Sequence, residues 1–166
     1  MLYNSEMTQV IHNERKLMKK LIIATVLASA AGFASAADVT LSTGHNTATN
    51  QNMIGLSTTL AKSGPLGVVV GADRSTSGAE NVNRVHAALT ADVAKVLGAT
   101  VTARVGAAYL DRSINENGVV GVAGVSAAYP LTKQVSAVAD YSYQYANDRS
   151  RDLNGGIVAV GLRVAF

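Results

Sequence analysis

Apolar and polar residues alternate along most of the chain after residue 36. Residues 156–166 show the alternation most clearly. One phase carries Gly156, Val158, Val160, Leu162, Val164 and Phe166, and the other carries Ile157, Ala159, Gly161, Arg163 and Ala165. Alternation with a period of two predicts a β-strand with one apolar face. Such a face is unfavourable at an open edge in water, but it is stable where it meets lipid and the strand closes a barrel.

The same alternation predicts seven further strands. They cover residues 37–44, 52–61, 66–73, 84–93, 99–110, 119–129 and 134–146. Most of these strands have about the 9–11 residues that a tilted strand needs to cross a bilayer. The sequence therefore predicts an all-β fold, an eight-stranded antiparallel up-and-down transmembrane β-barrel.

The connections between the predicted strands alternate in length. The longer, polar ones are residues 45–51, 74–83, 111–118 and 147–155, and the short ones are 62–65, 94–98 and 130–133. Short turns at one end and longer loops at the other are typical of an up-and-down barrel in an outer membrane.

Aromatic and charged residues fall on opposite phases of the predicted strands. The expected aromatic girdle consists of Tyr109, Tyr129, Tyr141, Tyr143, Tyr145 and Phe166. The opposite phase carries the charges Asp73, Arg84, Asp92, Arg104, Asp140 and Arg163. A soluble exported β-sandwich would show the same parity with its two faces reversed. The aromatic residues near both strand ends and the alternating loops favour the barrel.

The segment 18–36 has the order of parts found in a signal peptide. Lys19 and Lys20 precede an apolar run that is too short to span a bilayer. Small residues follow at Ala34, Ser35 and Ala36, which predicts cleavage between Ala36 and Ala37.

Residues 1–17 show neither helical nor strand periodicity. A signal peptide normally begins with its charged region, and Met18 directly precedes that region here. Two interpretations are open: residues 1–17 belong to an over-extended reading of the start, or they are a genuine N-terminal extension.

Cleavage after residue 36 changes the electrostatics. The remaining 130 residues, 37–166, make one barrel domain and keep a net charge of +1 out of +3 for the whole chain. This small charge gives no basis for nucleic-acid binding. The chain has no cysteine, so neither disulfides nor cysteine-bound metal can hold the fold.

With these features the chain resembles the small outer-membrane β-barrel proteins of Gram-negative bacteria, of the OmpA transmembrane-domain, OmpX and opacity-like types. In that family an alternating last strand with a final aromatic residue is the assembly signal, which Gly161, Leu162, Val164 and Phe166 match. The resemblance implies an exported monomer in the outer membrane that contacts lipid and lipopolysaccharide. It also implies periplasmic chaperones and the barrel-assembly machinery as partners during biogenesis.

The inward phase predicts a structural network of charges in the lumen, because buried arginine and aspartate are unfavourable unless paired. The expected members are Asp73, Arg104, Asp140 and Arg163. Asp140 and Arg163 lie on neighbouring predicted strands and are the pair most expected to meet.

Catalysis has little support in the sequence. His86 with a carboxylate and a serine would suit hydrolysis, but it faces inward and is followed by two alanines. The spacing of histidines and carboxylates predicts no metal site and no cofactor. The favoured function is therefore a non-enzymatic outer-membrane barrel with a structural or surface-interaction role. The alternative is a narrow porin-like channel, since the inward phase is rich in small residues; a soluble sandwich and an enzyme follow.

Overall fold

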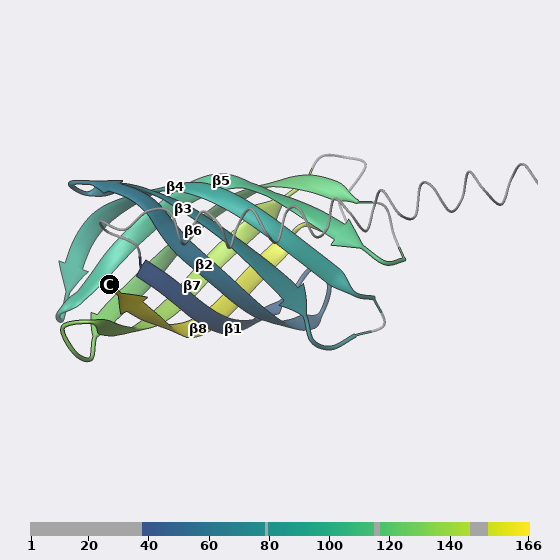
Figure 1. Cartoon of the computed structure of the whole chain (residues 1–166). Helices are drawn as coiled ribbons and strands as arrows, with labels where there is room; N and C mark the ends of the chain where they lie inside the picture. Colours follow the sequence, from purple (N-terminus) through teal and green to yellow (C-terminus); the bar gives the residue numbers. More distant parts are fainter. Residues whose placement is uncertain (1–37, 79, 115–116, 147–152) are drawn as a thin grey trace, which may run out of the picture. The chain divides into compact units, whose positions relative to one another are not determined.

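Eight antiparallel strands form a closed barrel in the computed structural model, which describes residues 38–78, 80–114, 117–146 and 153–166. The strands are β1 (Asp38–Asn46), β2 (Gln51–Ser63), β3 (Leu66–Ser75), β4 (Val82–Val96), β5 (Ala99–Arg112), β6 (Gly118–Pro130), β7 (Val135–Tyr145) and β8 (Gly155–Ala165). Each strand pairs with its neighbours in sequence, and β1 pairs with β8 to close the ring (Figure 1). The predicted fold class is thus confirmed. The segments expected to be a leader and an extension lie outside the described residues.

The barrel has two unlike ends. We call the end with Asp38, Phe166 and the tight turns the turn end, and the opposite end, where the longer connections lie, the loop end (Figure 1). The β4–β5 turn consists of Leu97 and Gly98 alone, with φ angles of 50° and 86°. Positive φ at both turn residues gives a backbone twist that matches the flanking strands, so the hairpin closes in two residues.

Several strands are longer than the alternation predicts. β4 begins two residues earlier and ends three residues later than the predicted strand 84–93. The first connection, expected as a long loop over residues 45–51, is reduced to residues 47–50. His45 and Asn46 extend β1 by pairing with Asn52 and Gln51. Polar residues can continue a strand at its end because backbone hydrogen bonds, not side chains, hold the ladder.

The outward faces of the strands form an apolar belt around the barrel. Large side chains such as Leu41, Leu89, Val105 and Val160 are more than half exposed, at 55%, 64%, 61% and 56%. The predicted aromatic residues also point outward and are exposed, from Tyr109 at 43% to Phe166 at 84%.

No helix among the described residues is long and apolar enough to cross a membrane.

Candidate functional site

The barrel lumen gathers the charged side chains of the strands. All six strand charges expected to face inward line one cavity: Asp73, Arg84, Asp92, Arg104, Asp140 and Arg163. The cavity has a volume of about 100 Å³, enough for only a few water molecules. The alternation of the sequence therefore assigned these residues to the correct face.

The first cluster in the lumen is centred on Asp73 of β3. Asp73 lies directly opposite Arg84 of β4, and Oδ2 of Asp73 accepts hydrogen bonds from Nε and Nη2 of Arg84 at 2.8 and 2.7 Å. Nδ1 of His86 lies 3.1 Å from the same oxygen. Nη1 of Arg84 also donates to Oε1 of Gln144 across the barrel at 3.3 Å. These side chains cross the lumen and join β3 and β4 to β7.

A second cluster lies deeper toward the turn end. Nη2 of Arg104 (β5) contacts Oδ1 of Asp140 (β7) at 2.5 Å, and both side chains are mostly buried. β5 and β7 are separated by β6, so the arginine bridges the lumen to reach its partner. A buried ion pair of this kind is destabilised strongly when one member is removed, because the other charge stays behind unpaired.

The expected contact between Asp140 and Arg163 is not formed, which corrects the sequence-based interpretation. In the β7–β8 register, Asp140 is opposite Ala159, while Arg163 is opposite Ser136. This four-residue offset separates the two side chains by about 13 Å along the strands. Arg163 instead donates to Oγ1 of Thr40 at 3.2 Å and lies 3.8 Å from Oδ2 of Asp38.

The turn end of the lumen is open and lined by polar side chains. Lys62 of β2 and Asp92 of β4 form an ion pair at 2.7 Å. Lys62 faces inward because the β2–β3 register shifts between Thr59 and Ala61, which reverses the facing of the residues that follow. The wide mouth at this end has a volume of about 640 Å³.

The loop end of the lumen is closed by an apolar layer, which we call the apolar cap. Its members are at most 7% exposed: Val82, Ala108, Leu110, Val120, Val122, Ala146 and Leu153. Leu110 and Leu153 are completely buried. This layer lies at the level of the first cluster, since Leu110 is paired with Arg84 and Val122 with Gln144.

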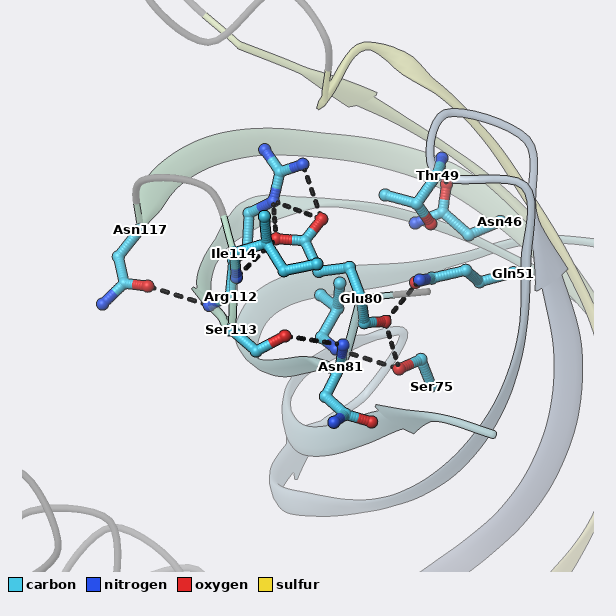
Figure 2. Close-up of polar contacts among 11 residues, drawn as sticks. Asn46, Thr49, Gln51, Ser75, Glu80, Asn81, Arg112, Ser113, Ile114 and Asn117 are labelled. Atoms are coloured by element: carbon cyan, nitrogen blue, oxygen red, sulfur yellow. Dashed lines mark hydrogen bonds and ion pairs between the residues drawn. The ribbon is translucent and has the colours of Figure 1, made fainter. Parts of the chain in front are cut away.

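At the loop end, Glu80 of the β3–β4 connection and Arg112 at the end of β5 form an arrangement that we call the loop-end clasp (Figure 2). Nη2 of Arg112 donates to Oε2 of Glu80 at 2.8 Å, and both side chains are almost fully buried. The backbone carbonyl of Glu80 accepts from Nε2 of Gln51 at 2.5 Å. The β3–β4 connection is therefore fixed to β5 and to the β1–β2 hairpin.

Sequence reasoning missed Arg84 as the partner of Asp73 and missed the loop-end clasp altogether. The pairing of Arg84 with Asp73 could have been predicted from the sequence, because the two residues lie on either side of one strand connection and are opposite each other in the ladder. The clasp had no such signal, because Glu80 lies in a loop where no periodicity indicates the direction of a side chain.

The lumen does not assemble a hydrolytic site. Among the residues that the structure describes, His86 forms its hydrogen bond with Asp73, and no serine hydroxyl bonds to its ring. Nor do the described residues include a group of three histidines and carboxylates that could hold a metal ion.

Several solved structures of small membrane β-barrels share this architecture. The N-terminal β-barrel domain of Pseudomonas aeruginosa OprF superposes with a TM-score of 0.65 at 11% identity, covering 79% of this chain and 97% of that chain. Neisserial surface protein A gives 0.57 at 16% identity over 79% and 95%. The Yersinia pestis outer-membrane protein Ail, determined in a phospholipid bilayer nanodisc, gives 0.54 at 10% identity over 79% and 99%.

These similarities establish the fold, which is that of the eight-stranded outer-membrane barrels. No protein-family model and no curated protein sequence matches the chain.

Proposed function

We propose that the protein is an outer-membrane barrel that conducts no ions and has a structural or surface-interaction role. The observation that carries the proposal is the distribution of side chains on a closed ring: an apolar belt outside and paired charges inside. In water the belt would be a large exposed apolar surface, whereas in a bilayer it is the surface that contacts lipid.

The dimensions of the barrel support a membrane location. Its strands have 9 to 15 residues, which is sufficient for a tilted strand to cross the hydrocarbon core. Closure leaves every strand paired on both sides, so no open edge faces lipid. By analogy with barrels that have short periplasmic turns, the turn end faces the periplasm and the loop end faces outward.

The lumen favours a closed barrel over a channel. The side chains of the apolar cap are almost fully buried, and Arg84 and Gln144 cross the lumen at the same level. The wide mouth at the turn end leads only to the small cavity lined by the charged clusters. A narrow porin-like channel, the alternative from the sequence, would require both layers to move.

The loop-end clasp supports a surface role. It braces the β3–β4 connection through an ion pair shielded from solvent (Figure 2). A fixed loop presents a binding surface at a smaller entropic penalty than a free one.

The partners during biogenesis are periplasmic chaperones and the barrel-assembly machinery, and the mature barrel is a monomer surrounded by lipid and lipopolysaccharide.

The test combines fractionation, gel mobility and conductance. We expect the protein in the outer-membrane fraction, resistant to SDS at room temperature and shifted in mobility on boiling, because a closed hydrogen-bonded ring resists detergent. Reconstituted in a planar bilayer, it should give no ohmic current. Recovery from the soluble periplasm with unchanged mobility would contradict the membrane assignment, and a steady conductance would favour the channel.

A further inference from the structure

The last outward-facing residue of each strand at the loop end forms a ring that we call the outer rim. Its members are His45, Asn52, Arg74, Asn83, Asp111, Val119, Tyr145 and Gly156. The rim has two unlike sectors: the members on β1–β5 are all polar or charged, whereas those on β6–β8 are Val119, Tyr145 and Gly156. A uniform ring of interface residues would have the same residue types on all sides of the barrel. The polar sector on β1–β5 departs from that pattern.

Arg74 is the one cation of the polar sector. On the outward faces of the described strands, Arg74 and Asp111 are the only residues with a formal charge. The other strand lysines and arginines point into the lumen or the loop-end clasp, where they are paired or line the mouth. Arg74 is exposed, and no described side chain pairs with its guanidinium group.

The position of Arg74 places its charge at the edge of the apolar belt. Ala72 precedes it on the same outward face of β3, and Ile54, 47% exposed, is its neighbour on β2. A lipid-facing arginine is strongly unfavourable at the bilayer midplane and is tolerated only near the interface. At that level a guanidinium group can bind the phosphate of a lipid headgroup bidentately.

The neighbouring side chains add donors and keep the site open. Oδ1 of Asn52 lies 3.1 Å from Nδ1 of His45, and Asn52 is two residues before Ile54, the partner of Arg74, so its amide lies diagonal to Arg74 on the outward face. On the other side, Asn83 is paired with Arg74 in the ladder and lies 3.5 Å from Oδ2 of Asp111. Asp111 is thus separated from Arg74 by β4. Its negative charge repels an anion, so an anion bound to Arg74 would lie on the β2–β3 side.

We propose that this sector, centred on Arg74 with Asn52 beside it, binds the phosphate group of an outer-leaflet lipid, as in a phosphorylated lipid A headgroup. The inference rests on the proposed membrane location and adds to it a lipid preference located on one side of the barrel. A phosphate on a lipid is favoured over a free anion because the apolar belt below Arg74 binds the acyl chains of the same molecule.

The test compares two lipids that differ only in phosphate. The full protein is reconstituted into phosphatidylcholine nanodiscs that contain a minor fraction of either phosphorylated lipid A or lipid A from which the phosphates have been removed. Lipid A retained per barrel is then counted by native mass spectrometry. We expect about fivefold greater retention of the phosphorylated form, as one basic side chain near an anionic surface provides.

Arg74→Gln should abolish this preference, and Arg74→Lys, which keeps the charge but not the bidentate geometry, should restore part of it. The matched control is Lys133→Gln, which removes an exposed cation in the β6–β7 turn at the turn end and should leave the preference unchanged. Equal retention of both lipids by the wild type, or an undiminished preference in Arg74→Gln, would overturn the proposal. Displacement of the bound lipid by inorganic phosphate would also overturn it, because the site would then recognise a free anion.

Gel mobility separates this outcome from failure of the membrane assignment. Wild type and Arg74→Gln should show the same shift on boiling, since the substitution lies at the rim. A wild type without that shift contradicts the barrel in the membrane itself. A normal shift without a phosphate preference contradicts only the lipid site.

Discussion

At the scale of single residues, the lumen is organised by arginines that reach across the barrel. Arg104 contacts Asp140 from two strands away, with side-chain exposures of 18% and 13%. Arg84 joins Asp73 to Gln144 in the same way. The planar guanidinium group, with donors on three nitrogens, suits such bridging contacts, whereas the strand lysines Lys62 and Lys95 line the open mouth.

Arg104→Met should destabilise the barrel more than Arg104→Met and Asp140→Asn together. The single change leaves a mostly buried carboxylate without its partner and lowers the free energy of unfolding by about 3 kcal/mol. The second change removes that carboxylate charge and so recovers part of the loss. The free energy of unfolding in urea, measured by refolding into lipid vesicles, gives both values. Equal or larger loss in the double variant would contradict the pair.

Arg163 provides the matched comparison. Because Asp140 and Arg163 are offset by four residues, Arg163→Met and Asp140→Asn should be additive within about 0.5 kcal/mol. A coupling as large as that of Arg104 with Asp140 would show that the β7–β8 register differs from the one described.

At the scale of strands, β8 combines three functions on one short segment. Its outward face is apolar, with Val158, Val160 and Leu162 each more than half exposed. Its inward face carries Arg163, and its backbone pairs with both β7 and β1 to close the ring. A residue on this strand is therefore fixed both in depth and in direction.

Val160→Arg should be much more harmful than Gln134→Arg. Val160 is opposite Thr43 on β1 and Ala139 on β7, in the middle of the belt. An arginine facing lipid at that depth is unfavourable by about 2–4 kcal/mol, whereas Gln134 lies exposed in the β6–β7 turn. Refolding stability in vesicles measures the difference, and similar values would show that Val160 does not face lipid.

At the scale of the whole molecule, the packing of the finished barrel and its assembly in the membrane depend on different residues. Phe166 follows β8, is 84% exposed and is outside the strand ladder. It thus contributes little to the packing of the finished barrel. Its position matches the assembly signal expected from the resemblance to small outer-membrane barrels, together with Gly161, Leu162 and Val164.

Phe166→Ala should therefore separate assembly from stability. We expect refolding stability in vesicles to fall by only about 1–2 kcal/mol, because the ring loses contact with lipid but has no partner in the strand ladder. The yield of heat-modifiable protein in outer membranes should fall severalfold, because the assembly machinery no longer recognises the last strand. Unchanged yield in cells would argue against a role of Phe166 in assembly.

The number of strands and the direction of nearly every strand side chain can be predicted from the sequence alone. Alternation is a local property: once one residue of a strand faces lipid, its neighbours are fixed by the period of two. Arg104 and Asp140 could thus be assigned to the lumen, and Val160 to the apolar belt, from residues a few positions away.

The contacts between inward residues, by contrast, follow from the three-dimensional arrangement of the strands. Pairing across the lumen depends on strand register and on the closure of β1 with β8, and a bulge such as the one in β2 changes the facing of every residue beyond it. Asp140 therefore meets Arg104 and not Arg163. Glu80 and Arg112 come from a loop and from the end of β5, and no local pattern indicated that their side chains meet.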